Sequence, residues 1–459
     1  MKNSNHVHFI GIGGISMSGI AEILVQKGLT ITGSDLHKSH LTEALKEKGV
    51  KIYIGHDAKN VKGADTVVIT SAIPASNPEL IYARKNNIPI MKRAQVIASL
   101  MEEQRGIAIS GTHGKTTTTS MISTIFLKGS QDPTILIGGE LDLINGNSYQ
   151  GKGEYLITEA DESDGSLLYF DPEIVVVTNI EMDHQDYYLS EKKLFKTFKN
   201  FLSKIPQNGK AVVCAEDKTL INLVDEKDAR VFTYGIDKGD LRAENYNLYP
   251  FGSIYDLVYK GNKLTEINLQ IPGKHNMLNS LASIAVALSV GLDITEIKKG
   301  IESYIGVHRR FEKKGLLGDI LIVDDYAHHP TEVEATLKAA KNTGYERIIA
   351  IFQPHRYTRT KHLMNEFNNS FNLVDHLIIT DIYSAGEKPI PGVEAEELAR
   401  NIAVKNSFQV VYVAELEDVV GYLRKIIKSK DLVLTIGAGN VYKVGEMLLE
   451  KMKNYREMA

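Results

Sequence analysis

The segment 111-GTHGKTT-117 constrains the fold of this chain more than any other stretch. A short apolar run, 106-GIAIS-110, leads into it, and a segment of helical character, 115-KTTTTSMISTIFLKG-129, follows it. In such a strand–loop–helix unit, backbone N–H groups and the helix N-terminus surround nucleotide phosphates. A plain glycine turn capped by threonines is the alternative, but both spacing and context favour a phosphate loop. We predict that it consists of Gly111, Thr112, His113, Gly114, Lys115, Thr116 and Thr117, with Lys115 at the terminal phosphates and the Thr116 hydroxyl at Mg²⁺.

Short apolar runs alternate with longer amphipathic segments along the whole chain, a pattern typical of α/β folds. In the first hundred residues we expect strands at 6–12, 29–35, 65–72 and 88–93, and a helix at 18–28. In the central region we expect strands at 106–110, 154–160, 173–179, 210–215 and 230–235, an irregular strand-like stretch to about 271, and a helix at 276–291. The last region has expected strands at 320–326, 347–353, 377–383, 409–414 and 432–439. We therefore predict three α/β domains in series, comprising residues 1–104, 105–306 and 307–459.

Composition narrows the class of protein. The 459 residues are 43% hydrophobic and 24% charged, with a formal net charge of −4, so there is no overall positive field that would attract nucleic acid. Cys214 is the only cysteine, which excludes an intrachain disulfide and fits a reducing compartment. The N-terminus lacks the pattern of a secretory signal, and no apolar stretch approaches the roughly 18 residues that span a bilayer. We expect a cytoplasmic protein with neither a membrane nor a nucleic-acid partner.

Acidic residues follow two expected strands of the central region. The run 159-EADESD-164 follows the strand at 154–160, and 179-NIEMDHQDYY-188 follows the strand at 173–179. Ligands bind at the carboxyl ends of strands in open α/β sheets, and Mg²⁺ needs oxygen ligands. Glu159 and His184 are the metal candidates, whereas most acids in such loops are solvated residues or helix caps. From its chemistry alone His184 has an equal claim to an ordinary role, because Mg²⁺ prefers oxygen to nitrogen.

A second glycine turn, 10-IGIGGISMSG-19, follows the first expected strand. Gly11, Gly13 and Gly14 fit the dinucleotide-binding pattern, but Ser16 stands where its third glycine belongs. Asp35 ends the second strand, near the position of a ribose-binding acid. Taken alone, the turn permits a nicotinamide enzyme, a second phosphate site or a turn without a ligand. Together with the phosphate loop, it suggests one site for ATP and one for the diphosphate of a large nucleotide-bearing substrate.

Two polar clusters follow successive expected strands of the last region, 324-DDYAHHPTE-332 and 353-QPHRYTRT-360. The forked guanidinium groups of Arg356 and Arg359 suit carboxylates or phosphates. Asp325 and His329 precede a helix that a proline can start. Helix capping and surface charge would explain one such cluster, but two at successive strand ends favour a site. No third ligand at a known spacing supports zinc at the histidines. A phosphate loop with acids could serve a kinase, an NTPase switch or an ATP-driven ligase, and a third domain with arginines favours joining chemistry.

Eight motifs occur in order along essentially the whole chain: GIGGISMSGIAE, GTHGKTTTT, EADESD, TNIEMDHQDYY, PGKHNMLN, HRRFE, VDDYAHHPTE and QPHRYTRT. Together they closely resemble the Mur ligase family of peptidoglycan synthesis, and within it the branch that adds L-alanine to UDP-N-acetylmuramate. The resemblance implies a three-domain α/β architecture, in which Rossmann-like N- and C-terminal domains flank a central P-loop ATPase-type domain. The N-terminal domain would bind the UDP-sugar, the central domain ATP and the C-terminal domain the incoming amino acid.

The resemblance also implies roles for single residues. The catalytic set would be Lys115, His184, Arg310 and His329, and the metal ligands would be Thr116, Glu159 and His184. ATP would be contacted by the phosphate loop and by Asn276, Asn279, Arg310 and Asp325. The UDP-sugar would be bound by Gly11, Gly13, Gly14, Ser16, Asp35 and Ser71, and the amino acid by His329, Arg356 and Arg359. Lys199 lies near the position of the lysine that many members carbamylate, but the alanine-adding branch generally lacks that modification, and none is expected here.

The implied activity is an ATP-dependent amide ligation. The lactyl carboxylate of UDP-N-acetylmuramate would be phosphorylated to an acyl phosphate, which L-alanine would then displace, giving ADP and phosphate with Mg²⁺ as cofactor. The expected partners are these small molecules, and the expected state is a monomer or weak homodimer. The alternatives are a recycling ligase that adds a tripeptide, a folate polyglutamate ligase, a nicotinamide-dependent oxidoreductase and a non-catalytic ATP-binding regulator. The oxidoreductase leaves GTHGKTTTT unexplained, and the folate ligases lack the N-terminal UDP domain.

Overall fold

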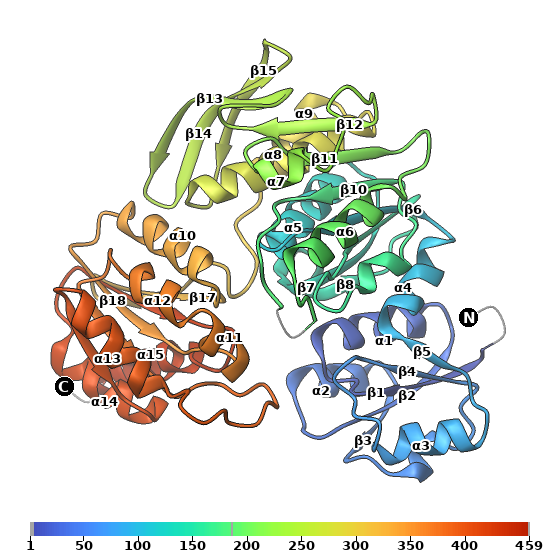
Figure 1. The fold of residues 1–459 in the computed structure, drawn as a ribbon, viewed down its shortest axis with the longest axis horizontal. Helices are drawn as coiled ribbons and strands as arrows, with labels where there is room; N and C mark the ends of the chain where they lie inside the picture. The colour runs from blue at the N-terminus through green and yellow to red at the C-terminus, as the bar shows by residue number, and fades with distance from the viewer. Residues whose placement is uncertain (1–3, 185–186, 458–459) are drawn as a thin grey trace. The chain divides into compact units, whose positions relative to one another are not determined.

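The N-terminal residues of the computed structural model, which describes residues 4–184 and 187–457, form a parallel five-stranded sheet (Figure 1). Its order is β3-β2-β1-β4-β5, which matches the first five strands of the Rossmann order 3-2-1-4-5-6. The strands are β1 (His6–Ile10), β2 (Thr30–Asp35), β3 (Lys51–Ile54), β4 (Thr66–Ile69) and β5 (Ile90–Lys92). The helices are α1 (Ile15–Gln26), α2 (His40–Glu47), α3 (Pro78–Lys85) and α4 (Arg93–Met101), with a 3₁₀ turn at Ala58–Val61.

The central sheet has ten strands in the order β15-β14-β13-β12-β11-β10-β6-β9-β7-β8. The strands are β6 (Arg105–Ser110), β7 (Thr134–Leu141), β8 (Gly146–Tyr149), β9 (Tyr155–Glu159), β10 (Ile174–Val177), β11 (Lys210–Cys214), β12 (Val231–Gly235), β13 (Leu241–Tyr249), β14 (Gly252–Tyr259) and β15 (Asn262–Leu269). The helices are α5 (Lys115–Lys128), α6 (Glu191–Leu202), α7 (Lys218–Ile221), α8 (Lys274–Ser289) and α9 (Ile294–Glu302). Strands β7, β9, β6, β10, β11 and β12 pair in parallel. Their carboxyl ends therefore lie along one edge, which carries the loops that the sequence marks as functional.

The C-terminal sheet has the order β16-β17-β21-β18-β19-β20, and only β16 among these strands is antiparallel to its neighbour. The strands are β16 (Glu312–Leu317), β17 (Ile320–Asp325), β18 (Arg347–Phe352), β19 (His376–Ile379), β20 (Gln409–Tyr412) and β21 (Asp431–Ile436). The helices are α10 (Pro330–Lys341), α11 (Tyr357–His362), α12 (Met364–Ser370), α13 (Ala395–Lys405), α14 (Leu416–Ile426) and α15 (Tyr442–Glu457).

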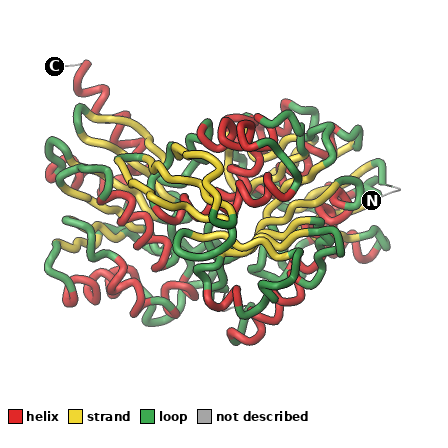
Figure 2. The backbone as a smooth tube through the Cα atoms, turned by 90° about the horizontal axis from the view of Figure 1, so that it is seen from above, coloured by secondary structure: helices red, strands yellow, loops and turns green. Residues whose placement is uncertain are grey.

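Alternate residues of the C-terminal strands enter two separate cores. In β18, Ile348 and Ala350 pack with residues of α10, α12 and α13, whereas Ile349 and Ile351 pack with residues of α14 and α15. Successive side chains of a strand point to opposite faces, so both faces of this sheet are covered by helices. Figure 2 shows strands near the C-terminal end running between helices. This is a doubly wound sheet, as the alternating sequence pattern predicts.

The expected parallel strands are confirmed to within a few residues. Strands β3, β7, β8 and β16 were not predicted, and the stretch expected to be irregular forms the regular strands β13, β14 and β15. The expected strand at 6–12 ends at Ile10, because Gly11 turns the chain with a φ of +81°. By residue contacts the chain divides into two compact units, one of residues 1–244, 256–265 and 278–303, the other of residues 245–255, 266–277 and 304–459. The boundaries at 104 and 306 stay a prediction. Across the described residues, the helices are all too short or too polar to cross a membrane.

Candidate functional site

The phosphate loop joins β6 to α5 and requires glycine at both ends. Gly111 has a φ of +128°, and a Cβ there would lie 2.1 Å from Thr178 Oγ1. Gly114 has a φ of +84°, caps α5, and would place a Cβ 2.6 Å from Asn279 Oδ1. Both the backbone conformation and the close approach of a neighbour therefore exclude a side chain.

The carboxyl end of β10 holds this loop in place. Asn179 accepts a hydrogen bond from His113 N at 2.9 Å through Oδ1 and donates from Nδ2 to His113 O at 3.0 Å. The Thr112 hydroxyl donates to Glu181 O at 3.0 Å and accepts from Glu181 N at 2.8 Å. Thr178 Oγ1 also donates to His113 O, at 2.6 Å. The loop is thus held in place by hydrogen bonds within the protein. The sequence analysis assigned no role to Thr178 and Asn179, although both begin the motif TNIEMDHQDYY.

Lys115 lies among hydrogen-bond acceptors at the first turn of α5. Its Nζ donates to Gly111 O at 2.5 Å, to Thr112 O at 3.2 Å and to Glu162 Oε1 at 2.7 Å. Burial by itself lowers the pKa of this ammonium, but the nearby carboxylates, Glu162 first and then Asp161, outweigh it, and the pKa of Lys115 is raised. The lysine therefore carries a full positive charge at the phosphate loop at neutral pH.

Glu162 is an acid of the site that the sequence does not single out from its run. Its side chain is only 2% exposed and pairs with Lys115. Burial raises the pKa of Glu162 to about 7, although the charge of Lys115 opposes the rise. Only the three-dimensional fold shows that this acid of 159-EADESD-164 faces the phosphate-loop lysine.

The proposed metal ligands lie on three segments around the loop. Thr116 is buried in the first turn of α5, and Glu159 ends β9, where its Oε1 accepts a hydrogen bond from Gly138 N at 2.7 Å. His184 has a φ of +53°, and its Nε2 lies 3.6 Å from Asp183 Oδ2 and 3.9 Å from Glu162 Oε1. A hydroxyl and several carboxylates beside one imidazole form an oxygen-rich set, which fits Mg²⁺ better than zinc. Asp186, another acid of this segment, falls outside the described residues.

The two candidate asparagines lie one turn apart on α8. Asn279 is buried, and its side chain lies against Gly114 of the phosphate loop. Asn276 is also buried and donates from Nδ2 to Pro272 O at 2.7 Å. The structure thus places Asn279 at the phosphate loop, and a role of either residue in binding ATP stays a prediction.

The N-terminal glycine turn is braced by Asp35. Gly13 N donates to Asp35 Oδ2 at 2.9 Å, and a Cβ on Gly13 would lie 2.9 Å from the same oxygen. Gly14 caps α1, which carries Ser16 as its second residue. The exposed Ser71 follows β4, so it lies near the same carboxyl edge of the sheet. The six residues predicted to bind a UDP-sugar thus lie at or after the ends of β1, β2 and β4, and one carboxylate oxygen of Asp35 accepts a hydrogen bond from the turn itself.

In the C-terminal unit, Asp325 is fixed at the end of β17. Its two carboxylate oxygens accept hydrogen bonds from Phe311 N and Ala327 N, both at 2.8 Å. Burial raises the pKa of Asp325 to about 6, against the opposing charge of Arg310. The Arg310 guanidinium lies over the ring of Tyr326, 5.1 Å from its centroid. Arg310 therefore lies near Asp325, and a role of either residue in binding ATP stays a prediction.

His329 forms the N-cap of α10, and a backbone N–H of that helix, from Thr331, donates to its Nδ1 at 3.4 Å. The ring is only 3% exposed. His329 thus caps a helix, and its predicted roles in catalysis and in binding the amino acid stay predictions.

Arg359 and His355 form a second group at the end of β18. Arg359 Nη1 donates to His355 Nδ1 at 3.2 Å, and the imidazole stacks on Tyr383 with centroids 5.7 Å apart. Burial and neighbouring positive groups, His328 first, lower the pKa of His355. Arg356 precedes α11 as its N-cap, with a φ of +70°, and its N donates to Tyr383 O at 2.8 Å.

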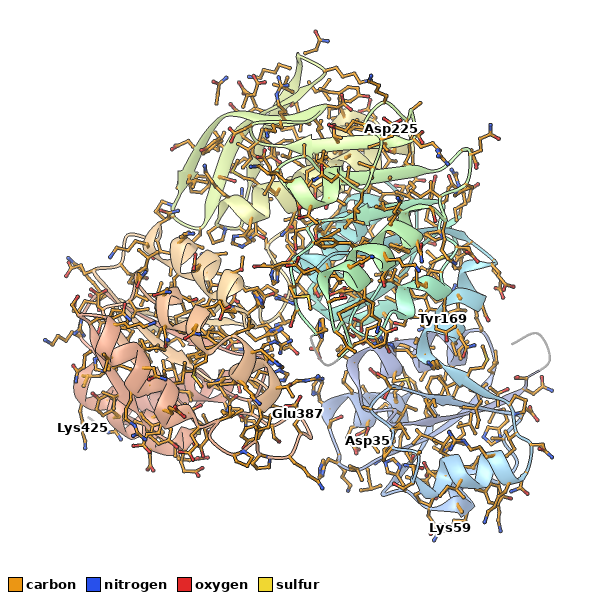
Figure 3. The ribbon with its side chains drawn as sticks, in the orientation of Figure 1. Asp35, Lys59, Tyr169, Asp225, Glu387 and Lys425 are labelled. Atoms are coloured by element: carbon orange, nitrogen blue, oxygen red, sulfur yellow. The ribbon has the colours of Figure 1, made fainter. Side chains whose placement is uncertain are left out.

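Glu387, in the loop after β19, was missed by sequence reasoning (Figure 3). Its carboxylate accepts hydrogen bonds from Thr358 N at 3.0 Å and from Thr358 Oγ1 at 2.7 Å. Thr358 lies between Arg356 and Arg359 in sequence. The segment with both arginines is thus fixed by contacts from the loop after β19.

Comparisons with known proteins agree with these features. Residues 6–105, 109–287 and 309–439 match the family models "Mur ligase family, catalytic domain", "Mur ligase middle domain" and "Mur ligase, glutamate ligase domain", in that order. The chain is 48% identical over 448 residues to a UDP-N-acetylmuramate–L-alanine ligase from Geotalea daltonii, covering 97% of this chain and 98% of that protein.

Solved structures show the same likeness over the whole length. A UDP-N-acetylmuramate–alanine ligase from Thermotoga maritima is 28% identical, with a TM-score of 0.85 over 98% of this chain and 99% of that one. A murein peptide ligase from Psychrobacter arcticus is 25% identical, with a TM-score of 0.73 over the same shares. The relatives and the three matching models together show that the chain belongs to the Mur ligase family.

Proposed function

We propose that this protein joins L-alanine to the lactyl carboxylate of UDP-N-acetylmuramate in an ATP-dependent reaction of peptidoglycan precursor synthesis. The observation that carries the proposal is the 48% identity, along nearly the whole chain, with a ligase of that name. The hydrogen-bonded phosphate loop with its partly buried, charged Lys115 supports the use of ATP.

We assign one substrate to each predicted domain. Residues 1–104 bind the UDP-sugar through the glycine turn, Asp35 and Ser71, and residues 105–306 bind ATP. Residues 307–459 bind the amino acid, whose carboxylate suits the guanidinium groups of Arg356 and Arg359.

Mg²⁺ is the proposed cofactor, and Thr116, Glu159 and His184 are the residues that would hold it. When bound, it supplies positive charge beside the transferring phosphoryl group. Lys115 and the N–H groups of the phosphate loop offset the negative charge that accumulates where the carboxylate and ATP meet. Arg310 and Asp325 are proposed to contact the nucleotide from the C-terminal domain.

The proposed reaction has two steps. A lactyl carboxylate oxygen attacks the γ-phosphorus of ATP while the bond from that phosphorus to the bridging oxygen breaks, which releases ADP and leaves an acyl phosphate. The alanine nitrogen then attacks the acyl carbon, and the tetrahedral intermediate expels phosphate together with the electrons of the broken C–O bond. The amine gives up its proton in this step, and the products are an amide and inorganic phosphate. The acyl phosphate is necessary because the oxygen of a free carboxylate is a very poor leaving group.

Phosphate release from Mg-ATP tests the proposal. With UDP-N-acetylmuramate present, release should require an added amino acid and be fastest with L-alanine. Release that requires the tripeptide instead would assign the protein to the recycling ligases, and release that ignores the UDP-sugar would refute the substrate assignment. ATP and UDP-sugars are cytoplasmic molecules, so we expect the protein to act in the cytoplasm. We also expect a monomer or weak homodimer without nucleic-acid or membrane partners.

A further inference from the structure

Glu162 carries a buried carboxylate that the proposed reaction does not use. Its Oε1 accepts a hydrogen bond from Lys115 Nζ at 2.7 Å. Within the described residues its other oxygen, Oε2, has no hydrogen-bond partner. A buried carboxylate with an unpaired oxygen is costly, and native proteins generally provide a partner for such a group. Glu162 therefore has the capacity for one more favourable interaction beside the phosphate loop.

The position of Glu162 is fixed from its backbone. The fully buried Tyr188 donates from its hydroxyl to Glu162 O at 2.6 Å, and Gly165 N donates to the same carbonyl at 2.9 Å. Glu162 Oε1, which accepts from Lys115, also lies 3.9 Å from His184 Nε2. The backbone at Glu162 is thus fixed, and its Oε1 lies near both the phosphate-loop lysine and a proposed metal ligand.

A nucleotide phosphate at the loop competes with Glu162 for Lys115. The ammonium now donates to Glu162 and to the carbonyls of Gly111 and Thr112, and phosphate oxygens are strong acceptors for the same donor. If the ammonium turns to the phosphate, the Glu162 carboxylate loses its partner while an anion of the same sign arrives. Like charges in a poorly solvated site repel strongly, so the phosphate binds more favourably when a cation accompanies it.

We propose that Glu162 exchanges Lys115 for the cation of the Mg²⁺-nucleotide, and that this exchange makes nucleotide binding depend on Mg²⁺. Glu162 is in this sense a positioning residue: it holds the ammonium at the phosphate loop and then faces the cation beside Thr116, Glu159 and His184. The inference rests on the ATP site proposed above and adds a residue to it.

Calorimetric titration of the full-length protein with adenylyl imidodiphosphate, in Mg²⁺ or in EDTA, tests the exchange. Glu162→Gln keeps the shape of the side chain but removes its charge. In EDTA it should bind the nucleotide about tenfold more tightly than the unmodified protein, because the competing charge is gone. The gain in affinity from Mg²⁺ should shrink by about the same factor or more.

Two variants control for structural effects. Glu162→Asp retains the charge and should retain most of the Mg²⁺ dependence. Asp164→Asn removes a charge from the same loop, where that carboxylate accepts a hydrogen bond from Ser166 N, and should keep the full Mg²⁺ dependence. A gain from Mg²⁺ that is the same in the unmodified protein and in Glu162→Gln overturns the role of Glu162. If the unmodified protein binds no nucleotide, the proposed ATP site itself is refuted.

A double-variant comparison covers the case in which Glu162→Gln does not fold. Lys115→Met leaves the buried carboxylate without its cation and should lower the melting temperature of the nucleotide-free protein. Adding Glu162→Gln to Lys115→Met should recover most of that loss, since no buried charge is then unpaired. A double variant that is no more stable than Lys115→Met would contradict the pairing on which the exchange depends.

Discussion

Replacing Gly111 by alanine tests whether the phosphate loop works through its fixed backbone. The added Cβ would lie 2.1 Å from Thr178 Oγ1, 2.9 Å from Thr178 N and 3.0 Å from Asn179 O. The threonine hydroxyl can rotate, but the two backbone atoms follow directly on β10, whose Val177 pairs with Ser110 of β6. The loop, and not the strand, must therefore move.

The size of the effect follows from two terms. A φ of +128° is strained for alanine, which costs about 1–3 kcal/mol, and overpacking costs about 1–3 kcal/mol more. If the loop keeps its place, the free energy of unfolding should fall by about 2–6 kcal/mol, the sum of these two costs. If it yields by about 1 Å, the N–H groups that face the phosphates are misplaced, and turnover should fall about 100-fold.

Gly49→Ala provides the matched control. Gly49 has a φ of +87°, and no atom lies within 4 Å of the point that a Cβ would occupy, so alanine there adds backbone strain of about 1–2 kcal/mol without a clash. Urea unfolding and kcat/KM for ATP should be measured on both variants. Gly49→Ala should leave kcat/KM unchanged. Equal effects of Gly111→Ala and Gly49→Ala on both stability and kcat/KM would contradict the role assigned to the backbone of the phosphate loop.

Three further predictions concern other parts of the site. Asn179→Ala removes both side-chain hydrogen bonds to the loop and should lower kcat/KM for ATP about tenfold or more; an unchanged value would show that the loop holds itself. Glu387→Ala removes both hydrogen bonds from Thr358 and should raise KM for alanine about tenfold. Thr358→Val removes only the hydroxyl hydrogen bond and should raise KM less. Equal affinities for alanine in the unmodified protein and in Glu387→Ala, measured by titration, would contradict this prediction. The pKa of Asp325 is raised from 3.8 to about 6, so between these pH values the folded protein holds a proton that the unfolded chain has released. The free energy of unfolding should therefore fall as pH rises through this window. Asp325→Asn should remove this part of the pH dependence when urea unfolding is measured at several pH values.

The phosphate loop was predictable because its information is local. The loop glycines Gly111 and Gly114, Lys115 and the flanking strand and helix all lie within residues 106–129. The spacing of these residues alone is enough to indicate a phosphate loop. The parallel strands were predictable for a similar reason, since strands buried on both faces read as continuous apolar runs such as 348–352. The edge strand β16, with the sequence EKKGLL, carries no such run and was missed.

The support of the loop depends on contacts far apart in sequence. Thr178 and Asn179 reach the loop only because β10 is the neighbour of β6, which the chain order does not reveal. Glu162 differs from the other acids of its run through its burial and its contact with Lys115. Asp35 shows the reverse case: its place after β2 suggested a ligand contact, and the structure gives one of its oxygens to Gly13 N. The sequence was enough to locate the site, whereas the contacts among its residues could be seen only in the folded structure.

Transfer of ¹⁸O tests the central claim most directly. UDP-N-acetylmuramate labelled with ¹⁸O in its lactyl carboxylate should be incubated with the protein, Mg-ATP and L-alanine, and the released phosphate analysed by mass spectrometry. The proposed acyl phosphate predicts one ¹⁸O atom in each phosphate from a doubly labelled carboxylate, together with ADP. Amide formation without ¹⁸O in the phosphate, or with ¹⁸O in AMP, would contradict it.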